Sequence, residues 1–215
     1  MATGDDQKLV GLPPNRIEAL ADGVFAVAMT VLVLEIHVPQ LPEGAAPEAL
    51  SKALLALGPK IASYAVGFIL LGTLWVGHHY QFAYIRRTDR GLLWINLFFL
   101  LAVAFLPFCV GLLGSYGTLA LPCILYGCVL LFAGACLLGQ WIYATSDHRL
   151  VSASLDEAIV RALRDRVAVG MVGYGAALAT AFVSPIASLV LYAGMPLLYL
   201  LPGRIDRHVK PRRQP

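Results

Sequence analysis

Residues 16–39 read RIEALADGVFAVAMTVLVLEIHVP, an apolar run whose acidic interruptions are Glu18, Asp22 and Glu35. Prolines bracket the run at positions 13, 14 and 39, and proline is tolerated at a helix start but not in its interior. The run is long enough for a bilayer-crossing helix, which needs roughly 20 apolar residues. A first transmembrane helix is therefore predicted from Arg16 to Val38.

The rest of the chain has the same apolar character. Of its 215 residues, 59% are hydrophobic and 13% are charged, whereas about 25% of the residues in a soluble domain are charged. This composition excludes both a soluble globular domain and a disordered chain. An amphipathic helix is expected within residues 47–60, and five further spans at 61–80, 91–113, 119–144, 167–183 and 185–201. The predicted fold is an all-α integral membrane protein with six transmembrane helices per chain, in one domain covering residues 1–215.

The basic residues predict the orientation of these helices. Fourteen of the sixteen Lys and Arg residues lie in the N-terminal tail and first helix entry, the second-to-third connection, the fourth-to-fifth connection and the C-terminal tail. Only Lys52 and Lys60 lie on the other side. Because cytoplasmic loops carry such an excess, both termini are expected in the cytoplasm, with residues 1–15 and 204–215 as tails. This topology and anionic lipid account for the basic tail, so no nucleic-acid partner is expected.

Two faces of the first helix differ in character. Residues three, four and seven apart share a helical face, so one apolar stripe with a single hydroxyl group contains Val27, Thr30, Val31 and Leu34. Asp22 lies away from that stripe, on a face that continues through Ala26, Met29 and Val33 and is expected to bury the carboxylate against neighbouring helices. An apolar stripe is common in bundle packing, so the stripe by itself does not establish a pore.

Asp22 is the most informative residue of the segment, because an ionisable side chain inside a span is by default a functional-site hypothesis. A buried carboxylate needs hydrogen-bond donors. The cytoplasmic ends of the first three helices offer a polar cluster for this purpose, formed by Arg16, Trp75, His78, His79 and Asn96.

Catalytic and metal-binding chemistry have little support in the sequence. His78 and His79 are adjacent and point about 100° apart on a helix, without a second cluster of ligating residues. No nucleophile elbow, phosphate-binding loop or dinucleotide fingerprint occurs. The four cysteines lie in apolar runs and are expected to behave as small hydrophobic side chains. The sequence therefore predicts no enzymatic activity, no metal site and no cofactor.

The motifs of the first three spans resemble the bacterial relatives of the TMEM175 potassium channels. The family pattern R-x-x-x-F-S-D-G-V-F-A-I-A is similar to residues 16–28, and its T-L-L-V-L-E-I continuation is similar to the run that ends at Ile36. The segment Trp75-Val-Gly-His78-His79 resembles the second-helix motif. Asn96-Leu-Phe-Phe-Leu and Phe105-Leu-Pro107-Phe resemble the third.

The resemblance implies a homotetramer of six-helix chains in the plasma or inner membrane of a bacterium, whose first helices surround a pore for monovalent cations. It implies pore-lining roles for Val27, Thr30, Val31 and Leu34, and a helix-anchoring polar cluster of Arg16, Asp22, Trp75, His78 and Asn96. One departure stands out, since Leu20-Ala21 replaces the family's Phe-Ser. One hydroxyl-mediated hydrogen bond of the anchor is therefore expected to be missing.

The expected mechanism is permeation through rings of side chains. Rings of Val27, Val31 and Leu34 would form a hydrophobic constriction, and a Thr30 ring would transiently coordinate potassium, with modest preference over sodium. The alternative is a proton-coupled secondary transporter in which Asp22 and His78 relay protons. The internal repeats and broken helices typical of transporters are absent from the sequence. A passive scaffold would show no transport at all.

Overall fold

The structure, a computed structural model, describes residues 14–44 and 46–200. Its long helices are α1 (Pro14–Val31), α3 (Gly58–Phe82), α4 (Arg90–Tyr116), α5 (Ala120–Thr145), α6 (Glu157–Ala181) and α7 (Pro185–Leu200). Shorter elements are η1 (Leu32–Glu35), α2 (Pro47–Ala56) and η2 (Ser146–His148). Within the described ranges the only β pairing is an isolated bridge between Ile85 and Val151. The chain is thus all-helical, and most of both predicted tails lies outside these ranges.

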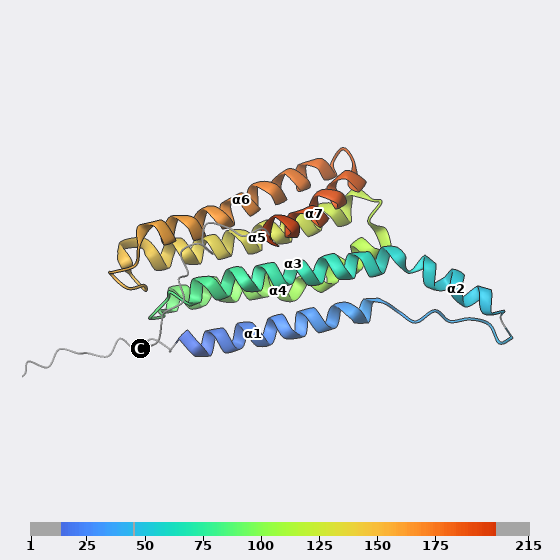
Figure 1. Cartoon of the computed structure of the whole chain (residues 1–215), viewed down its shortest axis with the longest axis horizontal. Helices are drawn as coiled ribbons and strands as arrows, with labels where there is room; N and C mark the ends of the chain where they lie inside the picture. The colour runs from blue at the N-terminus through green and yellow to red at the C-terminus, as the bar shows by residue number, and fades with distance from the viewer. Residues whose placement is uncertain (1–13, 45, 201–215) are drawn as a thin grey trace, which may run out of the picture.

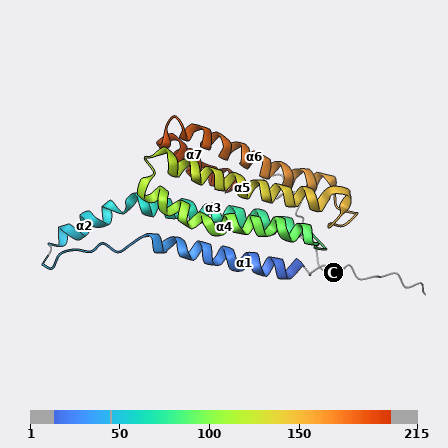
Figure 2. The same cartoon turned by 180° about the vertical axis from the view of Figure 1, so that it is seen from behind.

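The long helices run side by side in an elongated bundle (Figures 1 and 2). Helix α1 lies along one edge, where it packs against α3 and α4, and α6 and α7 lie along the opposite edge with α5. The main core fills the space between these layers, and its fully buried members include Phe99, Val103, Leu130 and Ala177. Helix α1 is therefore covered on one side by its own chain.

Four helical segments are long and apolar enough to cross a membrane, namely 14–35, 58–82, 90–116 and 120–148. The chain is a multi-pass membrane protein, but α6 and α7 do not meet the same criterion. Helix α6 carries Arg161, Arg164, Asp165 and Arg166 in its first half, which leaves fewer than 18 residues of uncharged helix. Helix α7 has 16 residues. The six-helix count is therefore supported at four of the six expected positions.

The first helix ends earlier than predicted. The α-helix stops at Val31, tightens into the 3-10 turn η1 and gives way to extended backbone at Ile36. Proline disfavours helical backbone in the residue before it, so Pro39 explains why Val38 is not helical. The prediction that the helix continues to Val38 was therefore wrong for residues 36–38.

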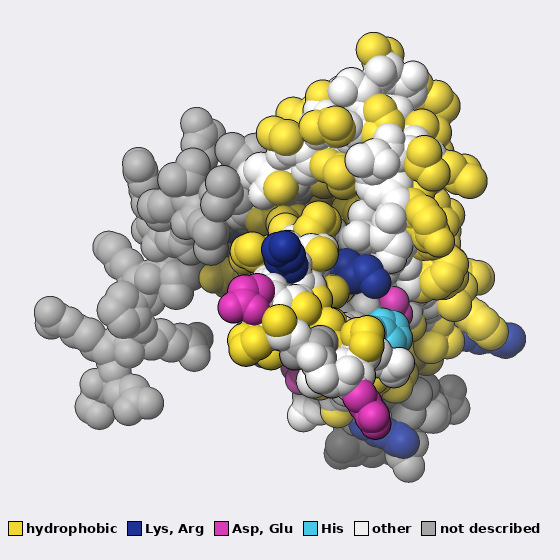
Figure 3. All heavy atoms as spheres, turned by 90° about the vertical axis from the view of Figure 1, so that its right-hand side faces the viewer, with side chains coloured by type: hydrophobic (Ala, Val, Ile, Leu, Met, Phe, Trp, Pro, Cys, Tyr) yellow, Lys and Arg dark blue, Asp and Glu magenta, His cyan; other side chains and the backbone are white. Residues whose placement is uncertain are grey.

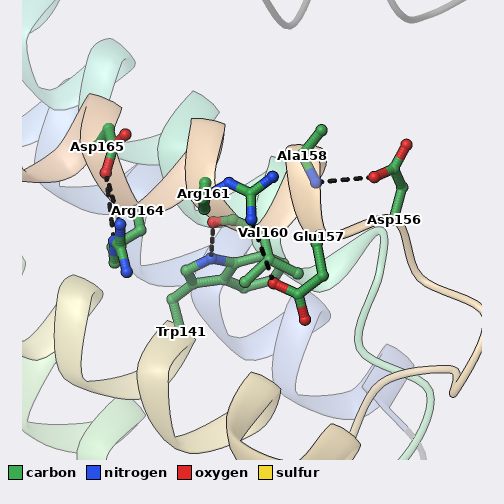
Figure 4. Close-up of polar contacts among 8 residues, drawn as sticks. All are labelled: Trp141, Asp156, Glu157, Ala158, Val160, Arg161, Arg164 and Asp165. Carbon is green, nitrogen blue, oxygen red and sulfur yellow. Dashed lines mark hydrogen bonds and ion pairs between the residues drawn. The ribbon is translucent and has the colours of Figure 1, made fainter.

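Helix α6 begins ten residues before the predicted fifth span. The Asp156 carboxylate accepts a hydrogen bond from the backbone N–H of Ala158 at 2.7 Å, which caps the helix (Figure 4). The buried Trp141 side chain donates from Nε1 to the Val160 carbonyl at 3.0 Å and fixes this first turn against α5. The predicted fifth span was located by its apolar residues alone. The first turns of α6 are charged, so they were not recognised as part of that helix.

The basic residues separate by end, as the sequence predicted. Eight described arginines lie at one end of the bundle, near the start of α1, in the α3–α4 connection, at the start of α4, just after η2 and in the first half of α6. They are Arg16, Arg86, Arg87, Arg90, Arg149, Arg161, Arg164 and Arg166. Lys52 and Lys60 belong to α2 and the start of α3, at the other end. Figure 3 views that other end, where charged side chains lie among hydrophobic ones.

A cluster of hydrogen bonds around Asp89 connects separate segments at the arginine-rich end of the bundle. The Asp89 carboxylate caps α4 by accepting from Leu92 N at 2.9 Å, and it also accepts from Tyr143 Oη at 2.8 Å and Arg149 Nε at 3.2 Å. Burial raises the pKa of this carboxyl group, but these hydrogen bonds and the Arg149 charge together outweigh burial and hold the pKa below its ordinary value. The cluster connects the α3–α4 connection to the end of α5.

We expect Asp89→Ala to lower the melting temperature of the purified protein, because loss of a helix N-cap costs about 1 kcal/mol. Since the folded pKa lies below the ordinary value of 3.8, the carboxylate stabilises the fold above that value and this contribution is lost as the pH falls through the folded pKa. The difference between Asp89→Ala and wild type should therefore shrink in acid. Thermal unfolding in detergent at several pH values measures it.

Asp165→Ala is the matched control, because its carboxylate pairs only with the exposed neighbour Arg164 among the interactions described, and such exposed pairs contribute little. Equal melting temperatures for the two variants would contradict a structural role for Asp89.

Candidate pore-lining helix and its anchor

One narrow face attaches α1 to its own subunit. Its buried members recur every three or four residues, and they are Ile17, Ala21, Phe25, Ala28 and Leu32. The Phe25 ring packs against the Phe99 ring of α4, with centroids 5.9 Å apart. This spacing is that of an amphipathic helix with a single covered side. The sequence predicted a two-faced helix but did not identify this face as the attached one.

The predicted stripe lies on the opposite side of α1 and is exposed in the single chain. Val27 is 61% exposed and Leu34 is 69% exposed, and Thr30 and Val31 are also exposed. Because α1 is an edge helix, no other described helix of the chain covers these four side chains. The structure therefore leaves the whole predicted stripe available to a common axis or to a partner.

The Thr30 hydroxyl group has a defined orientation. Its Oγ1 lies 2.9 Å from the carbonyl oxygens of both Ala26 and Val27 in the preceding turn. A hydroxyl group has one hydrogen to donate and two lone pairs that accept. With the hydrogen directed at the helix backbone, the oxygen lone pairs are left on the exposed side, where they suit a cation.

The tightening of α1 into η1 aligns the outer part of the stripe. Side chains three residues apart eclipse one another in a 3-10 helix, so Leu34 follows Val31 along the helix axis. The outer end also packs closely on α4, since a Cβ atom built at Gly111 would lie 2.5 Å from a carboxylate oxygen of Glu35. Gly111 was not singled out from the sequence, because a single glycine in an apolar helix carries no signal.

Asp22 contacts α3, as predicted, but it is not buried. Its Oδ1 accepts a hydrogen bond from Trp75 Nε1 at 2.8 Å, and the Trp75 ring stacks on His79 with centroids 5.5 Å apart. The expectation of a buried Asp22 face was wrong for the single chain, since Asp22, Ala26 and Val33 are exposed. Only a narrow face of α1 is covered, and Asp22 lies at its margin.

Two other members of the predicted cluster, His78 and Asn96, join α3 to α4 inside the core. His78 Nε2 and Asn96 Oδ1 lie 2.8 Å apart, and both side chains are buried. The imidazole ring is also stacked on Phe82 and Phe99, with centroids 4.3 and 5.4 Å apart. The histidine is therefore held by one hydrogen bond and by two stacked aromatic rings.

The predicted five-residue cluster thus divides into two pairs and one separate residue. Arg16 is exposed and has no hydrogen bond or ion pair to Asp22 or His78 among the described residues. Ala21 is fully buried, so packing fills the place where a serine hydroxyl would stand. In the same ranges no hydrogen bond links Asp22 with His78, and no group of three His, Cys, Asp or Glu residues is arranged to hold a metal ion.

A buried amide pair was missed by the sequence reasoning. Gln140 Nε2 donates to Gln81 Oε1 at 2.8 Å, and Gln81 Nε2 donates to the Leu137 carbonyl at 3.0 Å. Both glutamines are completely buried between α3 and α5. Each was visible in the sequence as a lone amide at the end of an apolar run, which is a usable signal for an interhelical hydrogen bond.

Comparison with known proteins assigns this arrangement to a family. A family model described as the endosomal/lysosomal potassium channel TMEM175 matches residues 16–107, which include α1, α3 and most of α4. A potassium channel of Streptomyces collinus is 35% identical over 189 residues, covering 86% of this chain and 90% of that protein. The chain belongs to the TMEM175 family. The resemblance inferred from the motifs is confirmed, and the family is one of ion channels and not of enzymes.

Two further TMEM175 relatives place the chain within the family. The crystal structure of a lysosomal potassium-selective channel TMEM175 homologue from Chamaesiphon minutus matches with a TM-score of 0.77 and 30% identity, covering 87% of this chain and 96% of that one. The human endosomal/lysosomal proton channel TMEM175 is 34% identical over 101 residues, which is 45% of this chain and 20% of the human protein. The bacterial relatives therefore match this chain over nearly their whole length.

The His78–Asn96 pair predicts a specific pattern of stabilities. Asn96→Leu leaves a buried imidazole without its partner, which costs about 1–3 kcal/mol, whereas replacing both partners by apolar groups of similar shape is nearly neutral. We therefore expect His78→Phe combined with Asn96→Leu to recover much of the stability lost in Asn96→Leu alone. Thermal unfolding in detergent of wild type, His78→Phe, Asn96→Leu and the double variant measures the coupling energy. If the losses of stability in the two single variants simply added up in the double variant, a direct pair would be contradicted.

Proposed function

We propose that the chain is a potassium-permeable cation channel whose pore is lined by α1 helices from four copies of the chain. The observation that carries the proposal is the exposed stripe of Val27, Thr30, Val31 and Leu34 on an edge helix, opposite its attached face. A stripe that no helix of its own chain covers is free to meet its symmetry mates around an axis. The Streptomyces and Chamaesiphon relatives are named as potassium channels, which supports the permeant ion.

The proposed membrane topology has six spans, with α6 and α7 as the fifth and sixth. Helix α6 has 25 residues, so its charged first half would extend beyond the bilayer while residues 167–181 lie within it. The clustering of arginines at one end favours that end as cytoplasmic, with both termini inside. The chain would act as one domain of residues 1–215 in a bacterial cell membrane, with the helical residues 16–35 lining the pore.

The proposed mechanism uses side chains alone. Rings of Val27, Val31 and Leu34 would narrow the pore and gate it by dewetting. Four Thr30 oxygens, each with its hydrogen directed at its own helix, would replace part of the water shell of a potassium ion. Because few oxygens contribute, the preference for potassium over sodium is expected to be modest.

The polar residues would act as an anchor for the pore helix. The Asp22–Trp75 bond connects α1 to α3, and the His78–Asn96 pair holds α3 on α4, so the two pairs together relate α1 to the core. Arg16, exposed at the inner end of α1, is proposed to complete this anchor when the chains assemble.

Thr30→Ala should reduce the preference for potassium over sodium. We expect a fall in the permeability ratio by a factor of about 2–10, since a neutral hydrogen-bonding group contributes about 0.5–1.5 kcal/mol. Reversal potentials of purified protein in liposomes, with potassium on one side and sodium on the other, measure the ratio. Thr180→Ala is the matched control, because Thr180 makes the same bond to its own helix, to the Ala176 carbonyl at 2.8 Å, but lies on α6.

An unchanged reversal potential in Thr30→Ala would move selectivity away from α1. The competing function is a proton-coupled transporter that uses Asp22 and His78. Absence of current from a verified tetramer, together with pH-driven uptake that Asp22→Asn abolishes, would replace the channel by that transporter.

Val31→Asn should raise the single-channel conductance. A polar side chain in a hydrophobic constriction favours its hydration, and a wetted constriction conducts. Val33→Asn is the control, since Val33 is similarly exposed on the same turn but lies off the stripe. Single-channel recording compares the two, and an equal effect of both variants would contradict the assignment of the pore face.

A further inference from the structure

Glu35 continues the attached face of α1 beyond its last apolar member. In the 3-10 turn η1, residues three apart eclipse one another, so Glu35 follows Leu32 along the helix axis. Leu32 is completely buried. The chain therefore places a carboxylate where the repeat of the attached face would continue with an apolar side chain, and a carboxylate at that position needs a site that accepts it.

A glycine of α4 makes room for this carboxylate. A Cβ atom at Gly111 would lie 2.5 Å from a carboxylate oxygen of Glu35 and 2.8 Å from its Cδ atom. Both distances are shorter than the contacts that real Cβ atoms make. Any larger residue at position 111 would therefore displace the Glu35 side chain from α4.

A small pocket lies beside this contact, and we call it the Glu35 pocket. Its volume is about 10 Å³, roughly the space that one water molecule needs. Besides Glu35 and Gly111, its lining includes Lys60 and Tyr64 of α3. The lysine carries the charge opposite to that of the carboxylate, and a phenol O–H can donate a hydrogen bond, directly or through water. Both groups attract the Glu35 carboxylate to this side of α1.

The backbone of η1 is fixed around Glu35. The Ile36 N–H donates to the Val33 carbonyl at 3.0 Å, which closes the 3-10 turn. The His37 Nδ1 atom lies 3.2 Å from the Glu35 carbonyl oxygen. Because these contacts make the turn a unit, the direction of the Glu35 side chain determines the orientation of the whole turn.

We propose that Glu35 is a positioning residue for the outer ring of the pore, held by Gly111 and Lys60. Neighbouring residues of a 3-10 helix point about 120° apart, so a Glu35 side chain fixed on α4 directs Leu34 away from α4 and towards the proposed axis. Leu34 is 69% exposed, so packing within the chain does not fix its direction. The inference rests on the proposed pore face, and it adds a residue that sets the width of the outer constriction without lining it.

The test is single-channel recording of the full-length protein in lipid bilayers, with Gly111→Ala as the main variant. The added methyl group displaces the far end of a flexible side chain, so this variant should fold and assemble, and it changes no charge. We expect a several-fold higher conductance, because a Leu34 ring whose direction is no longer fixed narrows and dewets the pore less. Gly139→Ala is the matched control, since a Cβ atom there would meet nothing within 4 Å.

Two backgrounds separate a positioning role from a general disturbance of α4. Glu35→Ala leaves no carboxylate to displace and Leu34→Ala leaves no ring to misplace, so Gly111→Ala should not change the conductance of either background. An effect that persists in one of these backgrounds, or that equals the effect of Gly139→Ala in wild type, would overturn the inference. Absence of current from wild type would overturn the proposed function and this inference with it, so the two failures are distinguishable.

A second variant tests the Glu35 pocket from its opposite wall. Lys60→Met removes the charge that attracts the carboxylate, and it should also raise the conductance. Lys52→Met is its control, because Lys52 is the other described lysine at this end of the bundle but belongs to α2 and does not line the pocket. Equal effects of the two lysine variants would assign the change to surface charge alone and contradict the role of the pocket.

Discussion

The attachment of α1 through one narrow apolar face governs the rest of this structure. Five side chains, spaced three or four residues apart, hold the helix against α3 and α4. Because the helix lies at the edge of the bundle, the remaining circumference is left for contacts outside the chain. The proposed pore face and the exposed Asp22–Trp75 bond both follow from this placement.

Two pairs of buried polar side chains link neighbouring helices in the core. Inside a bilayer an unpaired polar group finds no water, so its pairing fixes which helices are neighbours. His78 with Asn96 relates α3 to α4, and Gln81 with Gln140 relates α3 to α5. Helix α3 is thereby fixed to both of the central helices, and α1 in turn bonds to α3 through Trp75. A short chain of specific hydrogen bonds thus links α1 to the core, in addition to its apolar face.

Much of this arrangement could be predicted from the sequence. The apolar runs identified four spans that the structure supports, and the 3.6-residue periodicity identified the exposed stripe. The motifs also placed Asp22, Trp75, His78 and Asn96 in one polar cluster across the first three spans, and the structure divides these four residues into two hydrogen-bonded pairs. The exposure of Asp22 could not be foreseen, because periodicity shows which residues share a face but not how many neighbours a helix has. The charged first turns of α6 were missed because the prediction followed apolar runs, and these turns lie before the apolar run of that helix.

The short 3-10 turn at the end of α1 gives the outer end of that helix a second geometry. A 3-10 helix rises about 2.0 Å and turns 120° per residue, against 1.5 Å and 100° for an α-helix. Recoiling the four residues of η1 as α-helix would shorten the helix by about 2 Å and swing the Glu35 carboxylate through about 80° around its axis. The same change would move Leu34 off the line of Val31. A rewinding of this turn would therefore present a different set of side chains at the end of α1, and it would also shift the buried Leu32 and the contact of Glu35 with Gly111.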